Sequence, residues 1–170
     1  MKKKTKTLSR AGVFAGLYVA LSLLIMPLSF GFVQVRLAEG LCLLPLIFPE
    51  AVPALFIGCI ISNLVGGCML LDVIFGSLIT LVAALLSWFV GRLFKRTALK
   101  IIIGGLFPVL LNALLLPVVW YFCYGGLKYI YIVQAAIILA GQAFSVYAVG
   151  TPILLACKKL KESGLLGMSN

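Results

Sequence analysis

The sequence predicts an all-α integral membrane protein, with residues 1–170 forming one domain built as a bundle of six transmembrane helices. Hydrophobic residues make up 64% of the chain and its mean hydropathy is +1.23, which is more apolar surface than a soluble domain of this size could bury. The apolar residues form long runs, which are typical of membrane-spanning helices and lack the alternation of a β-barrel. Clusters of basic residues separate these runs and indicate the orientation.

Twelve of the fourteen Lys and Arg residues fall into three clusters along the chain. Cytoplasmic loops of membrane proteins are enriched in Lys and Arg. Six crossings place all three clusters and both termini on the cytoplasmic side, with basic tails at about 1–10 and 158–170, whereas five or seven crossings would split the clusters. The clusters are Lys2, Lys3, Lys4, Lys6 and Arg10, then Arg92, Lys95, Arg96 and Lys100, then Lys158, Lys159 and Lys161, which leaves Arg36 and Lys128 outside.

The first three helices follow from apolar runs and chain breakers. The first is expected over 11–32 as a retained helix, because its apolar run is long and no convincing signal-peptide cleavage site precedes its end. The second, over 36–48, is only about 20 Å long at about 1.5 Å per residue, so it must be tilted, sunken or covered by protein. Pro49 and Glu50 open the third helix, which the glycine pair at 66–67 ends.

The last three helices are longer. They are expected over 72–91, 100–124 and 129–157, and a Gly-Gly turn at 125–126 separates the fifth from the sixth. Proline bends a helix, and glycine lowers helix stability. These residues are therefore expected to bend or loosen the fifth and sixth helices, at Pro108 or Pro117 and at Gly150 and Pro152.

Only four acidic residues are present, and two of them have ordinary structural explanations. Glu162 belongs to the cytoplasmic tail. Glu50 begins the third helix, where a carboxylate favours the helix dipole. Glu39 and Asp72 instead begin the second and fourth helices at the predicted outer face, where ionisable groups are costly and indicate a functional site. Arg36 and Asn63 are expected at the same depth, so residues from three helices converge on one candidate site.

Structural alternatives stay open for these residues. Asp72 could be a helix N-cap. Glu39 could pair with Arg36 at i, i+3. Asn112 and Gln142, deeper in the fifth and sixth helices, could join helices together or line a pocket. The first helix also carries a strip of small residues that could serve internal packing or a partner subunit, namely Ala11, Gly12, Ala15 and Gly16.

Several functional classes are excluded. The chain has no His, its five Cys residues form no CxxC pair, and it lacks GxxxxGK[ST], GxSxG and HExxH, so a metal site, a catalytic centre and an ATPase site are not expected. Its positive charge lies at membrane-facing ends and does not indicate nucleic-acid binding. The sequence therefore predicts a non-enzymatic subunit that is embedded in the lipid bilayer, captures a solute and has no cofactor of its own. Partner proteins would supply the energy for transport.

Three segments carry distinctive patterns, namely VQVRLAEGLCLLP at 33–45, FIGCIISNLVGG at 56–67 and LLDVIFGSLITLVAALLSWFVGR at 70–92. They resemble the QueT family of queuosine-precursor transporters, the substrate-specific S components of energy-coupling-factor (ECF) importers. The likeness runs over about residues 8–157. It implies a six-helix S component in the bacterial plasma membrane. It also implies that the first helix, through Ala11 and Ala15, docks on a membrane coupling subunit served by two ABC-type ATPases that use ATP.

The resemblance further implies capture of 7-aminomethyl-7-deazaguanine or queuine from outside, with Glu39 and Asp72 at the acidic positions of the motifs. A carboxylate can accept the amidine-like N–H pair of a deazaguanine in bidentate fashion, and a second carboxylate suits its amine. Gln142 stands where relatives often carry an acid. Amide and aromatic side chains suit the rest of a flat purine-like ring, and the candidates are Asn63, Asn112, Gln142, Trp120 and Tyr121. An S component for another vitamin-like solute and a structural membrane protein are the alternatives.

Overall fold

The computed structural model describes residues 2–29, 35–127 and 129–163, and all regular structure in those ranges is helical. The predicted end of the first helix near Phe32, the outer cation Lys128 and the tail beyond residue 163 lie outside the described residues. The elements are α1 (Lys2–Leu24), α2 (Met26–Ser29), η1 (Leu37–Leu46), α3 (Ala51–Val65), α4 (Leu70–Leu93), α5 (Thr97–Tyr124), α6 (Tyr131–Ala143), η2 (Phe144–Gly150) and α7 (Thr151–Glu162).

Within the described ranges, four helical stretches are long and apolar enough to cross a membrane, so the chain is a multi-pass membrane protein by length and composition. They are Lys4–Leu24, Leu70–Leu93, Thr97–Tyr124 and the composite Tyr131–Glu162. The apolar helices η1 and α3 are shorter. The 15 residues of α3 reach only about 22 Å, less than the hydrocarbon core of about 30 Å. The count of six transmembrane helices therefore stays a prediction.

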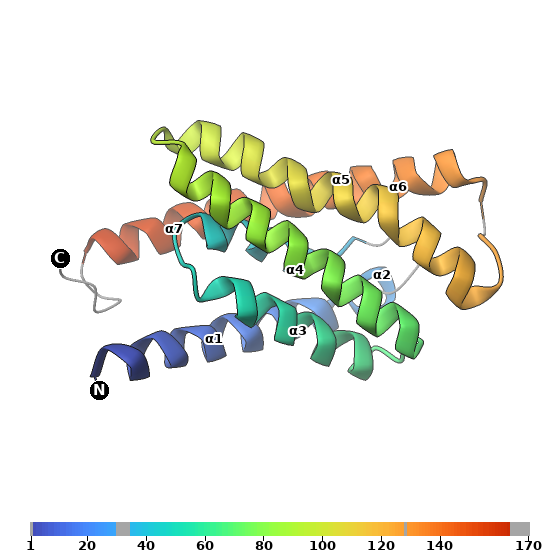
Figure 1. The fold of residues 1–170 in the computed structure, drawn as a ribbon, viewed down its shortest axis with the longest axis horizontal. Helices are drawn as coiled ribbons and strands as arrows, with labels where there is room; N and C mark the ends of the chain where they lie inside the picture. The colour runs from blue at the N-terminus through green and yellow to red at the C-terminus, as the bar shows by residue number, and fades with distance from the viewer. Residues whose placement is uncertain (1, 30–34, 128, 164–170) are drawn as a thin grey trace.

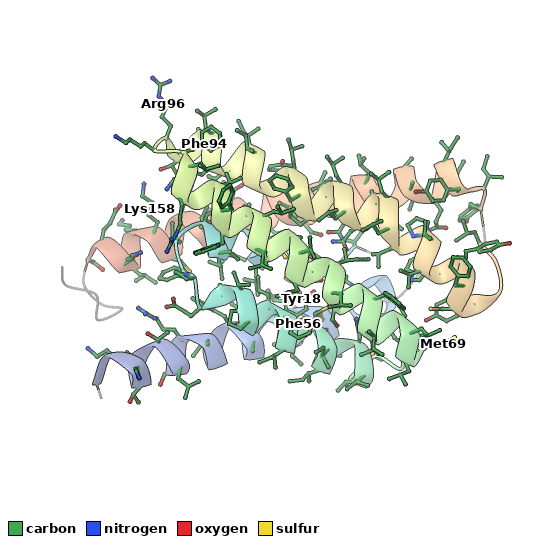
Figure 2. The ribbon with its side chains drawn as sticks, viewed as in Figure 1. Tyr18, Phe56, Met69, Phe94, Arg96 and Lys158 are labelled. Atoms are coloured by element: carbon green, nitrogen blue, oxygen red, sulfur yellow. The ribbon has the colours of Figure 1, made fainter. Side chains whose placement is uncertain are left out.

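The long helices lie side by side along the long axis of the molecule (Figure 1). The start of α1, the turn between α4 and α5, and the end of α7 all lie at one end, which we call the basic end. Figure 2 shows Arg96 and Lys158 there, and Met69 at the opposite end. The three basic clusters belong to these segments, so the fold collects their described cations at one end of the bundle, whereas Arg36 is buried elsewhere in it.

A set of polar and aromatic contacts closes the basic end. Arg10 of α1 forms an ion pair with Glu50 over 2.7 Å, and Glu50 is the N-cap residue of α3 without a side-chain capping bond. Arg10 and Lys161 both lie over the ring of Phe48, at 5.9 and 5.2 Å from its centroid, within cation–π range. Lys161 also donates to the Ile47 carbonyl at 3.0 Å. These contacts join α1, the end of η1 and α7.

The predicted short second helix is η1, a 3-10 helix in the core of the bundle. Its residues from Ala38 to Leu46 are all buried, so protein covers it, as its length required. Gly40 explains its close packing, because a Cβ there would lie 2.7 Å from the Ser145 carbonyl oxygen of η2. A 3-10 run of ten residues is unusual and often marks a functional segment, and η1 carries Glu39.

The predicted breaks after the third and fifth helices are confirmed. Gly67, with φ +74°, follows α3, and Gly125, with φ +71°, caps α5 in the left-handed conformation that glycine adopts without strain. Helix α5 continues through Pro108 and Pro117. The sixth helix is loosened earlier than predicted, because the π-helical η2 begins at Phe144 and ends at Gly150.

Candidate functional site

Glu39 lies in the first turn of η1 and is 1% exposed. Its Oε1 accepts a hydrogen bond from the Tyr18 hydroxyl of α1 at 2.5 Å. Its Oε2 accepts from Cys42 Sγ at 3.2 Å and from Asn112 Nδ2 of α5 at 3.4 Å. A carboxylate can accept about four such bonds. Three elements therefore orient this carboxylate while leaving it capacity to accept a bond from a ligand.

Arg36 precedes η1 as its N-cap residue and is buried. Its Nε donates to the Ser29 carbonyl at 3.1 Å. Its guanidinium group also lies within electrostatic range of both Glu39 and Asp72. Two carboxylates in one apolar bundle would repel each other, so a cation near both lowers the cost of burying them. Arg36 thus lies near Glu39, as predicted, and also near Asp72.

Asp72 lies in the first turn of α4 and is buried. The alternative that it caps this helix is wrong, because α4 begins at Leu70 and its N-cap residue is Met69. The Asp72 Oδ2 accepts a hydrogen bond from the Tyr124 hydroxyl of α5 at 3.3 Å. The indole of Trp120 also lies near this carboxylate, but its Nε1 has no hydrogen-bond partner.

Asn63 of α3 and Asp72 meet beside Gly76 of α4. A Cβ built on Gly76 would lie 3.4 Å from Asn63 Nδ2 and 3.5 Å from Asp72 Oδ1. The missing side chain at Gly76 therefore leaves space directly beside both polar groups. Asn63 Nδ2 has only a weak contact, at 3.6 Å, with the sulfur of Cys59.

Several buried polar atoms of α3, α4, α5 and α6 have no hydrogen-bond partner. An unsatisfied buried donor or acceptor costs about 1–3 kcal/mol, so such atoms call for a ligand or water. Gln142 of α6 is fully buried and has no partner for either end of its amide. Asn63 Oδ1 and Trp120 Nε1 also have no partner, and both residues lie near Asp72. Ser77 Oγ of α4 is unpartnered as well.

The structure thus brings most of the predicted site residues into one group, which we call the polar cluster. Glu39 contacts Asn112, Asp72 neighbours Asn63 and Trp120, and Arg36 lies near both acids. Gln142 is buried on α6, but its amide has no hydrogen bond to these residues. The polar cluster comprises Tyr18, Arg36, Glu39, Asn63, Asp72, Asn112 and Trp120. Its role in ligand binding stays a prediction.

The two acids do not lie at one depth. Figure 2 shows Tyr18, the partner of Glu39, near the middle of the long axis, and Met69, close in sequence to Asp72, at the end opposite the basic end. Tyr18 lies six residues before the last residue of α1, or about 9 Å along the helix. The polar cluster therefore extends from the end of the bundle towards its middle, with Asp72 nearer the end.

Tyr121 lies outside the polar cluster. Its side chain is 56% exposed, and it lines an open surface groove of about 610 Å³. The groove lies between the end of α5 and the start of α6, and its walls are Pro117, Val118, Tyr121, Leu127, Tyr129, Ile130 and Tyr131. Tyr124, Tyr129 and Tyr131 are exposed as well.

The sequence interpretation missed Tyr18 and two cysteines of the polar cluster's surroundings. Tyr18 follows Phe14 by four residues on an apolar helix face, a pattern that indicates ordinary core packing. Cys42 and Cys59 are both buried and free. Among the described residues, no group of three or more His, Cys, Asp or Glu side chains gathers to hold a metal ion.

The small-residue strip of α1 divides between two faces. Ala11 and Ala15 are partly buried and pack against the core. Gly12 and Gly16 are exposed, and a Cβ on either would meet no atom within 4 Å. The alanines thus serve internal packing, whereas the glycines leave a smooth outward surface that Ala20, also exposed, extends.

Buried charged side chains inside an all-helical, multi-pass membrane protein indicate a functional site. The family model described as QueT transporter matches residues 8–159, most of the chain. The chain therefore belongs to the QueT transporter family, and the resemblance that the sequence motifs indicated is confirmed. Comparisons with curated proteins and with solved structures returned no significant match.

Proposed function

We propose that this chain is the S component of an ECF-type importer and captures a queuosine precursor, 7-aminomethyl-7-deazaguanine or queuine, from outside the cell. The observation that carries the proposal is the polar cluster, in which a buried arginine lies within electrostatic range of two buried carboxylates. Membership of a transporter family supports a small-molecule ligand. Nothing else in the described core offers comparable polar chemistry.

The ligand's functional groups match those of the polar cluster. A deazaguanine presents adjacent N–H donors that one carboxylate accepts together, with charge-assisted hydrogen bonds. Glu39 takes this edge, because its neighbours already fix its orientation. Asp72 takes the amine of the ligand's side chain. The amide of Asn63 and the indole N–H of Trp120, each with an unsatisfied atom, complete the contacts to the ring's mixed donors and acceptors.

The proposed topology has six crossings, with the basic end and both termini in the cytoplasm of a bacterium. The positive-inside rule supports this orientation, because Lys and Arg gather at the basic end. Asp72, Tyr124 and Met69 then lie towards the extracytoplasmic side, where a solute enters. The short helices η1 and α3 cross only with the cover of the longer helices around them.

Transport requires partners in this proposal, because the chain has no phosphate-binding loop. A membrane coupling subunit and two ABC-type ATPases supply the energy. The exposed small residues of α1, Gly12 and Gly16, form the docking surface, since small residues let another helix approach closely. The partly buried Ala11 and Ala15 shape this surface from the inner side.

Binding to the purified protein in lipid nanodiscs tests the function. Isothermal titration with 7-aminomethyl-7-deazaguanine and queuine is expected to give tight binding, and guanosine serves as the control ligand. If neither deazapurine binds and another solute co-purifies, the chain is an S component for that solute. If no solute binds at all, the chain is not a capture subunit.

Gly16→Leu tests the docking surface. The new side chain projects into open space, so the fold should persist while co-purification with the coupling subunit and ATPases falls several-fold. Ala136→Leu, an equally bulky change on an exposed position of α6, should leave the complex intact. An undiminished complex with Gly16→Leu would place the docking surface elsewhere.

A further inference from the structure

Tyr18 is a fully buried tyrosine on α1, and the proposed ligand contacts do not use it. Its hydroxyl donates to Oε1 of Glu39. The other two donors to Glu39, Cys42 and Asn112, both bind Oε2. Cys42 belongs to η1 itself, and a thiol is a weak donor. Among the described residues, the hydrogen bond that Oε1 of Glu39 accepts from a neighbouring helix therefore comes from Tyr18 of α1.

The position of Tyr18 is fixed by the close packing of α1 on α3. A Cβ on Gly58 of α3 would lie 2.9 Å from Tyr18 Cβ and 3.1 Å from the Ala15 carbonyl oxygen. The ring therefore cannot swing towards α3. A displacement of α1 would carry the Tyr18 hydroxyl with it, because the side chain has no other space beside α3.

The two faces of α1 do different things. Phe14, Tyr18 and Ser22 are buried, and their spacing of four residues places them on one face. Gly12 and Gly16 are exposed on the opposite face, with open space around them. One rigid helix thus carries a bond to the ligand-binding carboxylate on one side and the outward surface of small residues on the other.

We propose that Tyr18 is a positioning residue that couples the placement of α1 to the ligand affinity of Glu39. This inference rests on the proposed function, because it assumes that Glu39 binds the ligand. When α1 holds its place, Tyr18 fixes Oε1 and so orients the carboxylate. When α1 shifts, the hydroxyl leaves Oε1 and the carboxylate loses that orientation. Coupling between two sites is reciprocal, so a ligand on Glu39 also restrains α1.

Tyr18→Phe tests the coupling, because it removes one oxygen atom and keeps the ring. The matched control is Tyr147→Phe, which removes the hydroxyl that donates to the Ile102 carbonyl at 2.8 Å, away from the polar cluster. The titration uses 7-aminomethyl-7-deazaguanine and full-length protein in nanodiscs. A hydrogen bond to a charged group contributes enough for roughly a tenfold loss of affinity in Tyr18→Phe, and the control should bind as the wild type does.

Hydrogen exchange of α1 separates positioning from mere packing. Saturating ligand should slow amide exchange over residues 18–24 in the wild type and in Tyr147→Phe. In Tyr18→Phe, the same saturation should leave the exchange of α1 unchanged, because the link is gone. Wild-type affinity together with ligand-dependent protection of α1 in Tyr18→Phe would overturn the proposal.

The design distinguishes this proposal from the proposed function. If the wild type does not bind the deazaguanine, the proposed function fails. The hydrogen bond between Tyr18 and Glu39 is then tested by thermal unfolding of Tyr18→Phe, Glu39→Ala and the double variant without ligand, because Glu39→Ala removes both acceptor oxygens. Non-additive losses support the bond, and additive losses overturn it. If Tyr18→Phe does not fold, faster exchange of α1 in ligand-free Glu39→Ala supports the bond, and unchanged exchange overturns it.

Discussion

The two buried carboxylates of the polar cluster are held in opposite ways. Glu39 has hydrogen bonds on both oxygens, from residues of α1, η1 and α5. Asp72 accepts one longer bond, at 3.3 Å, from the exposed Tyr124. The unpaired atoms of Asn63 and Trp120 lie near Asp72, and the space left by Gly76 lies beside it.

This difference indicates a division of labour. Glu39 is already oriented, so a ligand that binds it causes little reorganisation, which favours affinity. The surroundings of Asp72 contain buried donors and acceptors that a correct ligand would satisfy. A site with such groups discriminates strongly against analogues that leave them unpaired. We therefore expect Glu39 to supply most of the affinity and the region around Asp72 to supply specificity.

The largest effect is expected for Glu39→Gln. The variant keeps the side-chain size and removes the charge that accepts the ligand's N–H pair, so the affinity for 7-aminomethyl-7-deazaguanine should fall roughly 100-fold. Isothermal titration measures it. Glu162→Gln is the control, because Glu162 is exposed and has only a 3.9 Å ion pair with Lys158. A loss below threefold in Glu39→Gln would remove Glu39 from the site.

Asp72→Asn should reduce the affinity for the same ligand about tenfold, through loss of one charge-assisted contact with the amine. The loss should be much smaller for 7-cyano-7-deazaguanine, which lacks the amine. Parallel titrations with the two ligands compare them directly. Equal losses of affinity for the two ligands would show that Asp72 does not contact the amine. The proposed difference in role between Glu39 and Asp72 would then be wrong.

Gly76→Ala should weaken binding by about threefold without destabilising the fold. The added methyl group would lie in ordinary contact with Asn63 and Asp72 and would fill space that the ligand needs. Replacing a helical glycine with alanine favours folding by roughly 0.5–1 kcal/mol, so the melting temperature should not fall. Gly12→Ala is the control, since its surroundings are open. Unchanged binding in Gly76→Ala would exclude this space from the ligand site.

The smallest effect is expected for Tyr121→Ala, because Tyr121 lies in the exposed groove outside the polar cluster. Its affinity should stay within twofold of the wild type in the same titration. A large loss of affinity would instead show that the ligand binds in that groove. It would contradict the roles assigned to Glu39 and Asp72.

The sequence predicted much of the fold because apolar runs and glycine breaks are local signals. The ends of α3 and α5 at Gly66–Gly67 and Gly125–Gly126 are examples. The meeting of Asp72 with Asn63 was anticipated because few polar residues interrupt the apolar helices, and burial forces such groups together. The contact of Glu39 with Asn112 was not, because Asn112 was expected deeper in the bundle, either joining helices or lining a pocket.

Other features depend on rotation and packing, which a sequence does not show directly. Trp120 and Tyr121 are neighbours in α5, but successive helical residues point about 100° apart, so only Trp120 faces the polar cluster. The same rotation turns Gly12 and Gly16 outwards while Ala11 and Ala15 pack on the core. Tyr18 belongs to the polar cluster only because α1 packs beside η1.

Mass spectrometry of the small molecules retained by purified protein tests the central claim most directly. The account predicts that the purified wild-type protein retains a deazaguanine with a guanine-like edge, which is released on denaturation and detected by its mass. The same mass should be absent from the Glu39→Gln, Asp72→Asn double variant purified in the same way. A retained solute without adjacent N–H donors, or equal retention by the double variant, would contradict the account.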